Sequence, residues 1–217
     1  GSADILEKLG VKVNLTPQQV AHCVQEIGVG FMFAPNHHSA MKYAAPVRRE
    51  LGVRTLFNLL GPLTNPAGAQ NQVMGVFQRD LTVKLARVLQ QLGSQHVLVV
   101  HGADGMDEIS ISGSTYIAEL KNGTVLEYLV QPQDFDLHAA PLDSIRVANA
   151  DEARTVLLSV LDNQRGPARD IVQLNAGAAI YVAGLTATLQ EGVKKAKEVI
   201  ASGAAKNKLE ELVHIHF

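Results

Sequence analysis

The stretch VLVVHGADGMDEISIS, residues 97–112, contains the side chains best suited to chemistry, the adjacent carboxylates Asp107 and Glu108. Successive side chains of a regular strand point to opposite faces, so these two carboxylates can converge only in an irregular loop. Hard oxygen ligands of this kind suit Mg²⁺, which usually keeps several waters and is shared with substrate phosphates. A solvated Asp-Glu pair in a turn explains the spacing equally well, and both interpretations stay open.

Other polar residues have both a functional and an ordinary interpretation. His37 and His38 lack the helical spacing of an HExxH metal site and have no third ligand nearby, which favours capping or substrate contact. Arg48, beside Arg49, can grip a carboxylate or a phosphate with its planar guanidinium, although a lone arginine is more often a surface residue. Gly61 permits close approach of the backbone to a ligand and equally well ends a helix.

A predicted βαβ unit positions the acidic pair. NQVMGVF (71–77) and HVLVV (96–100) read as strands, and the helix LTVKLARVLQQL between them is capped by Asp80 and ended by Gly93. The two strands are therefore expected to be parallel, with a right-handed crossover. Ligands bind at the carboxyl ends of such strands, and the segment HGADGMDE directly follows the carboxyl end of the second strand. The segment APNHH would lie at a second strand end of the same edge if the predicted strand GVGFMFAP (28–35) joins this sheet.

The rest of the chain predicts helices and one hairpin. A capping box at TPQQ (16–19) begins a helix that Gly28 ends, and Asn122 with Gly123 forms a tight turn between two strands. ANADEARTVLLSVLD, ARDIVQLNAGAAIYVAGL and TLQEGVKKAKEVIASG read as helices, and a short helix follows near the end of the chain. We expect an α/β fold with a mixed, mainly parallel sheet surrounded by helices.

Composition narrows the function classes. The chain has 217 residues, 47% of them hydrophobic, with a net charge of −2 and no dense basic block, so nucleic acid and anionic membranes are not expected partners. Cys23 is the one cysteine, which excludes an intramolecular disulfide and sites with several cysteines. No apolar run has the length of a membrane span and no signal peptide is evident, so a cytoplasmic location is expected. The serines at 110, 112 and 114 lack a nucleophile-elbow motif and read as strand and turn residues.

Several segments together resemble one enzyme family. GSADILEKLGV, GFMFAPNHHSAMKYAAPVRRELGVRTLFNLLGPLTNPAG, VLVVHGADGMDEIS and QLNAGAAIYVAG are similar, in this order, to the anthranilate phosphoribosyltransferases of tryptophan biosynthesis. The resemblance implies Mg²⁺-dependent transfer of phosphoribosyl from phosphoribosyl pyrophosphate to the amine of anthranilate, with release of pyrophosphate. It also implies a nucleoside phosphorylase/phosphoribosyltransferase-like α/β domain, a homodimer in the complete protein, and no covalent enzyme nucleophile.

The resemblance implies roles for six residues of this chain. Asp107 and Glu108 match the family's magnesium-binding pair, and Arg48 matches the arginine that holds the carboxylate of anthranilate. The path of anthranilate is implied to be lined by Pro35, His38 and Gly61.

Motifs that the family carries upstream of the GSAD segment are not found in these 217 residues. These are a helical region, a glycine-rich GTGGD phosphate loop, an NxS motif and a KHGNR segment. We therefore expect residues 1–217 to form the α/β catalytic domain of a truncated chain that turns over little or nothing alone. Residues from about 40 to 66 are expected to form a helical segment that packs against the absent N-terminal helical domain.

Two alternatives remain. Pyrimidine nucleoside phosphorylases resemble this family in fold, but FAPNHH and NLLGPLTNP look more like the transferase. A non-catalytic, nucleic-acid-binding relative of the same fold would be expected to have a basic groove and to lack the acidic pair. This chain is slightly acidic and keeps both Asp107 and Glu108.

Overall fold

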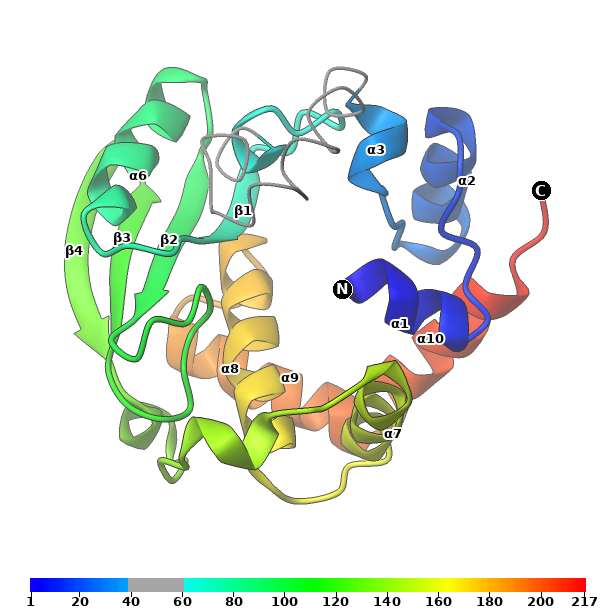
Figure 1. The fold of residues 1–217 in the computed structure, drawn as a ribbon. Coiled ribbons are helices and arrows are strands. Elements are labelled where there is room, and N and C mark those ends of the chain that lie inside the picture. Colours follow the sequence, from blue (N-terminus) through cyan, green and yellow to red (C-terminus); the bar gives the residue numbers. More distant parts are fainter. Residues whose placement is uncertain (39–60) are drawn as a thin grey trace. The chain divides into compact units, whose positions relative to one another are not determined.

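A computed structural model describes residues 1–38 and 61–217, which divide between two compact units (Figure 1). The terminal unit comprises residues 1–68, 147–158 and 203–217, and the sheet unit comprises residues 69–146 and 159–202. Residues 40–60 of the helical segment predicted at about 40–66 lie outside the described residues. Among the described helices, none is long and apolar enough to cross a membrane.

The terminal unit is helical in its described part. Its elements are α1 (Ser2–Lys8), α2 (Pro17–Ile27), α3 (Ala34–His37), α10 (Ala204–His214) and the larger part of α7 (Ala150–Leu161), which continues into the sheet unit. The predicted capping box is present at Thr16, and Gly28 ends α2 in the left-handed conformation. A small core forms around Leu15, Val20 and the fully buried thiol of Cys23.

The strand predicted at 28–35 is wrong. Residues 29–33 form no strand, and Ala34–His37 form the short helix α3, with a proline in its first turn. Proline supports the start of a helix because its fixed φ suits the first turn and its missing N–H is not needed there. The described residues of the terminal unit also offer no strand with which this apolar segment could pair.

The sheet unit contains a mixed sheet with the strand order β1-β2-β3-β4. Its strands are β1 (Asn71–Gly75), β2 (His96–Gly102), β3 (Thr115–Lys121) and β4 (Thr124–Val130). The predicted mixed α/β sheet is confirmed. Only the β1–β2 pair is parallel, in the register Asn71↔His96, whereas β2–β3 and β3–β4 are antiparallel, so the parallel share of the described sheet is smaller than expected.

Local sequence signals explain the two connections that were predicted. Helix α6 (Leu81–Gln91) joins β1 to β2 as expected, with Leu85, Ala86 and Leu89 buried along one face. Asp80 stands at its N-cap position, but its side chain makes no capping hydrogen bond. The β3–β4 hairpin turns at Asn122 and Gly123, whose φ values of +50° and +73° suit a tight hairpin turn.

Helices pack on both faces of the sheet. Leu98 and Val100 of β2 join the core with α8 (Pro167–Val182), while Val97 and Val99 point to the other face, where α6 packs on β2 and β3 (Figure 1). Helix α9 (Leu189–Ala201) lies against α8, and the contact is close at Gly177, where a Cβ would come within 2.5 Å of the Val193 backbone. The connection after β4 contains the 3₁₀ helices η1 (Pro132–Phe135) and η2 (Leu142–Ile145).

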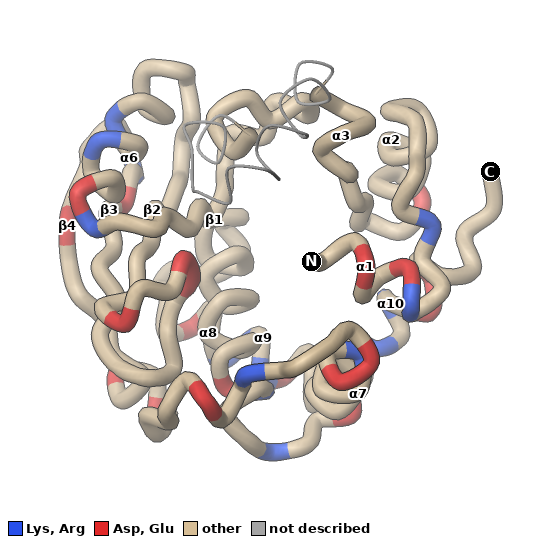
Figure 2. Tube along the Cα trace, viewed as in Figure 1, with Lys and Arg blue, Asp and Glu red and all other residues tan. Residues whose placement is uncertain are grey.

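Charges along the described trace are mixed in sign. Figure 2 shows Lys and Arg interspersed with Asp and Glu, without a long run of either sign. This distribution offers no continuous basic stripe of the kind that follows a nucleic-acid backbone.

Candidate functional site

The acidic pair lies on a loop at the carboxyl end of β2, as predicted. We call residues 103–114 the acidic loop; it connects β2 to β3 and leaves the sheet beside the end of the parallel strand β1. Asp107 and Glu108 are both exposed on it. The βαβ unit therefore brings two hard oxygen ligands to the edge of the sheet where ligands of such folds bind.

The backbone of Asp107 rests directly on the end of β1. A Cβ built on Gly75, the last residue of β1, would come within 1.6 Å of the Asp107 carbonyl oxygen. Real side chains do not tolerate so short an approach, so only glycine lets the acidic loop pass here. The two strand ends are also joined by His101, whose Nδ1 lies 2.8 Å from the carbonyl oxygen of Val76.

Asn175 of α8 holds the loop immediately after the acidic pair. Its Oδ1 accepts a hydrogen bond from the Ile109 N–H at 2.9 Å, and its Nδ2 donates to the Ile109 carbonyl at 2.9 Å and to the Ile171 carbonyl at 3.0 Å. Ile109 and Ile111 are buried in the core beneath the loop. The pair is thus attached to the core by both polar and apolar contacts on its C-terminal side.

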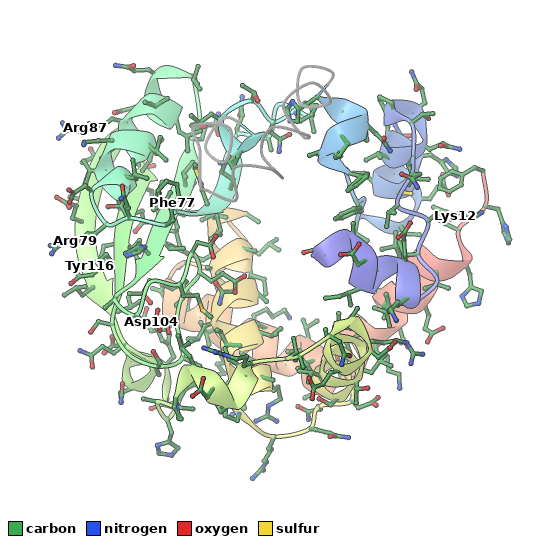
Figure 3. The ribbon with its side chains drawn as sticks, viewed as in Figure 1. Lys12, Phe77, Arg79, Arg87, Asp104 and Tyr116 are labelled. Atoms are coloured by element: carbon green, nitrogen blue, oxygen red, sulfur yellow. The ribbon has the colours of Figure 1, made fainter. Side chains whose placement is uncertain are left out.

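Asp104 organises the N-terminal side of the loop (Figure 3). Its Oδ1 accepts from the Met106 N–H at 2.9 Å, and its Oδ2 accepts from the hydroxyls of Ser110 and Ser112. Burial alone would raise the pKa of Asp104, but these hydrogen bonds stabilise its charged form and together hold the pKa below its ordinary value. Asp104 is therefore an anion that the loop itself satisfies.

The acidic pair has a different electrostatic state. Desolvation, and then the negative charge of Asp107, raise the pKa of Glu108 above its ordinary value. Neither carboxylate forms an ion pair with a basic side chain among the described residues. A cation bound here would relieve both the repulsion and the lost hydration.

The donor set fits a magnesium ion that is shared with a substrate. Within residues 1–38 and 61–217, no group of three or more His, Cys, Asp or Glu side chains converges as a closed metal site. Two carboxylates leave the remaining coordination positions to water and to substrate oxygens, which is how proteins usually hold Mg²⁺. The chemistry of the pair thus matches Mg²⁺ better than Zn²⁺, which favours nitrogen and sulfur ligands.

Three of the other predicted site residues lie in the terminal unit, and the fourth, Arg48, is not among the residues that the structure describes. Pro35 lies in the first turn of α3, and His38 follows that helix, with its N–H donating to the Ala34 carbonyl at 2.9 Å. Both are half-buried, as is Gly61, whose carbonyl accepts from the Thr64 N–H at 3.2 Å.

Sequence reasoning missed the residues that shape the acidic loop, namely Gly75, Asp104 and Asn175. A glycine inside a strand pattern is a known signal for close backbone approach. An Asp whose carboxylate accepts a hydrogen bond from the backbone N–H two residues later is a turn signal. The sequence indicates only strand and turn positions for Ser110 and Ser112, yet both hydroxyls donate to Asp104. The contact from Asn175 crosses 66 positions of sequence and has no local signal.

Comparison with known proteins identifies close relatives. Residues 1–206 match the family described as "Glycosyl transferase family, a/b domain". The chain is 64% identical over 98% of its length to an anthranilate phosphoribosyltransferase of Methylobacillus flagellatus, covering 62% of that protein. It is 61% identical over 99% of its length to the anthranilate phosphoribosyltransferase of Laribacter hongkongensis, covering 63% of it.

Solved structures agree with the sequence relatives. The anthranilate phosphoribosyltransferase of Thermus thermophilus superposes with a TM-score of 0.90 at 45% identity, over 98% of this chain and 63% of that one. The enzyme of Saccharomyces cerevisiae, solved in complex with PRPP and Mg, superposes with a TM-score of 0.88 at 26% identity, over 98% of this chain and 62% of that one. The chain thus spans a little over three fifths of the length of the relatives it matches.

Proposed function

The chain belongs to the glycosyl transferase family with an a/b domain, and on this basis we propose that its protein is an anthranilate phosphoribosyltransferase. The observation that carries the proposal is the 64% identity to a protein of that name over 98% of this chain. The exposed acidic pair at the carboxyl edge of the sheet supplies a matching chemical feature. The alternatives, a pyrimidine nucleoside phosphorylase and a nucleic-acid-binding relative, gain no support from these relatives.

The proposed reaction is a substitution at the ribosyl carbon of phosphoribosyl pyrophosphate. The amine nitrogen of anthranilate forms the new N–C bond, the C–O bond to pyrophosphate breaks, and the amine releases a proton. Mg²⁺ would neutralise the charge that develops on the departing pyrophosphate. No covalent enzyme intermediate is needed, so the protein contributes mainly by placing the amine and the leaving group in line.

The proposed roles of the residues follow from their chemistry. Asp107 and Glu108 hold Mg²⁺ through carboxylate oxygens. Their exposure and the repulsion between their charges support this role. Arg48 grips the carboxylate of anthranilate, for which a guanidinium offers two parallel donors. Pro35, His38 and Gly61 line the path of anthranilate, and their partial burial suits this role.

The same proposal covers the assembly and location of the protein. We expect a cytoplasmic homodimer in which the segment at about 40–66 packs against a helical domain. The 217 residues contain none of the family's glycine-rich phosphate loop, so the chain alone is expected to turn over little or nothing.

The test follows the fluorescence of anthranilate with phosphoribosyl pyrophosphate and Mg²⁺, in the complete reading frame that contains this chain. We expect anthranilate consumption, and a fall in kcat/KM of at least about a hundredfold in Asp107→Ala, which is the scale of losing one electrostatic stabiliser. Glu127→Ala, an exposed carboxylate on β4, is the matched control and should behave as the unchanged protein.

The opposite result would move the assignment to another member of the fold. If the unchanged protein is folded and consumes no anthranilate, the transferase proposal fails. Phosphorolysis of thymidine would then favour the phosphorylase, and salt-dependent binding of single-stranded DNA would favour the nucleic-acid-binding relative.

A further inference from the structure

We propose that Asp104 is a positioning residue that fixes the acidic loop so that Asp107 and Glu108 can bind a divalent cation together. The inference rests on the proposed function for the identity of the cation. The role of Asp104 goes beyond that function and is argued from the contacts within the loop. Asp104 acts through hydrogen bonds within the loop and does not itself touch the cation.

The contacts of Asp104 connect both sides of the acidic pair. The Met106 N–H precedes the pair and is bound by Oδ1 at 2.9 Å, whereas the hydroxyls of Ser110 and Ser112 follow the pair and are bound by Oδ2. A single carboxylate therefore closes the loop around residues 107 and 108. The two serines are also linked to each other, because the Ser112 N–H donates to the Ser110 hydroxyl at 3.0 Å.

The bonding of Asp104 argues against a role as a third ligand. Both of its oxygens are already used as acceptors, and the described residues contain no convergent group of three metal-binding side chains. Gly102 accommodates the Asp104 carboxylate so closely that a Cβ at position 102 would come within 2.5 Å of Oδ1. The carboxylate is thus held against the end of β2, although the residue remains exposed.

Loss of Asp104 should loosen the pair while the protein stays folded. The attachments that do not involve Asp104 would persist, namely the Asn175 bonds to Ile109 and the Ala103 N–H to Ser114 carbonyl bond of 2.8 Å. The three hydrogen bonds that Asp104 accepts would be lost, and with them the side-chain link between Met106 and the two serines, while the backbone bond from the Gly102 N–H to the Met106 carbonyl at 2.8 Å would remain. Groups that orient metal ligands in this indirect way typically contribute about tenfold to a hundredfold in metal affinity.

The experiment measures Mn²⁺ affinity, from the disappearance of the free-ion EPR signal, for the complete reading frame without substrates. Mn²⁺ is a suitable probe because carboxylate and water ligands accept it in place of Mg²⁺. We expect Asp107→Ala to abolish binding and Asp104→Ala to weaken it at least tenfold. Asp104→Asn keeps an acceptor for Met106 and a polar partner for a serine, so it should stay within about threefold of the unchanged protein.

Control variants separate positioning from general damage. Asp134 caps η1 in the same unit by accepting from the Gln131 N–H at 2.7 Å, so Asp134→Ala also removes a carboxylate that orders a turn. It should leave Mn²⁺ affinity unchanged. If Asp104→Ala fails to fold, Ser112→Ala removes one donor to Asp104 from a half-buried position and should weaken Mn²⁺ binding to a smaller extent.

Each other outcome overturns the inference. Equal weakening by Asp104→Ala and Asp104→Asn would contradict the inference that a neutral side chain with hydrogen-bonding groups at this position is sufficient to order the acidic loop. Unchanged affinity in folded Asp104→Ala would show that Asp104 has only a structural role. Mn²⁺ binding that does not depend on Asp107 would show that the acidic pair is not the cation site, so Asp104 could not position it. Because none of these measurements needs turnover, they decide the inference even if the anthranilate assay fails.

Discussion

A single carboxylate near the amino end of β2 and a pair of carboxylates at its carboxyl end differ in how their oxygens are satisfied. At the amino end, Glu119 of β3 accepts from the hydroxyls of Tyr181 at 2.7 Å and Tyr128 at 2.8 Å, and lies 2.8 Å from Nε2 of His96. At the carboxyl end, Asp107 and Glu108 are exposed and close to one another without a basic partner among the described residues. We call Glu119 with its three partners the closed group, and the exposed pair Asp107 and Glu108 the open pair.

The closed group has a structural role. Glu119 is 8% exposed, and it ties β2, β3 and β4 to α8 through its three partners. Desolvation, followed by the hydrogen bond to Glu119, raises the pKa of both Tyr128 and Tyr181, so both tyrosines stay neutral donors. A buried carboxylate with both oxygens already in contact with partners is poorly suited to bind a further ligand.

The difference shows how a site can be told from a stabilising network of the same residue types. Buried polar groups normally find partners inside the protein, and a satisfied network specifies one packing arrangement. An acidic pair that is held in place by its backbone but left without partners retains capacity for a cation. Burial and partners, more than residue type, separate Glu119 from Glu108.

The largest expected effect comes from breaking the closed group. Glu119→Ala leaves His96, Tyr128 and Tyr181 without their shared acceptor in the core, which should lower the free energy of unfolding by about 3 kcal/mol. Mn²⁺ affinity of the folded protein should not change. Urea unfolding checks the first expectation, with exposed Glu127→Ala as the control, and a loss as small as that of Glu127→Ala would contradict it.

Two glycines sharpen the comparison at an intermediate scale. Gly75→Ala would collide with the Asp107 carbonyl, and Gly177→Ala would collide with the backbone of Val193 between α8 and α9. Both should cost about 1–3 kcal/mol of unfolding free energy, which is typical of overpacking. Only Gly75→Ala should also weaken Mn²⁺ binding, because only it displaces the acidic loop. Equal Mn²⁺ affinities in the two folded variants would contradict this distinction.

The smallest expected effect is a pH dependence of the acidic loop. The pKa of Asp104 is lowered in the folded protein, so its contribution to stability is present above the ordinary Asp value of 3.8 and is lost as pH falls through the lowered value. The side chain is exposed, so this contribution should be less than about 1 kcal/mol. The stability difference between the unchanged protein and Asp104→Asn should shrink as pH falls from the ordinary Asp value of 3.8 through the lowered pKa of Asp104. A difference that is constant with pH would contradict the assignment.

Prediction from sequence succeeded where the determining contacts are local. Helix α6, the hairpin turn at Asn122 and Gly123, and the capping box at Thr16 depend on residues a few positions apart. The strand predicted at 28–35 failed because an apolar run does not reveal whether a strand partner exists. The same limit explains why the antiparallel share of the sheet was underestimated.

The residue order alone was sufficient to place Asp107 and Glu108 on a loop at the carboxyl end of a parallel strand and, through resemblance, to indicate the family. Tertiary structure was needed to show that Gly75 lies beneath the Asp107 backbone, that Asn175 holds Ile109 from α8, and that Glu119 is enclosed by two tyrosines. Patterns of hydrophobicity and turn residues encode local conformation. Whether a carboxylate is satisfied or open depends on side chains that folding brings together from distant positions.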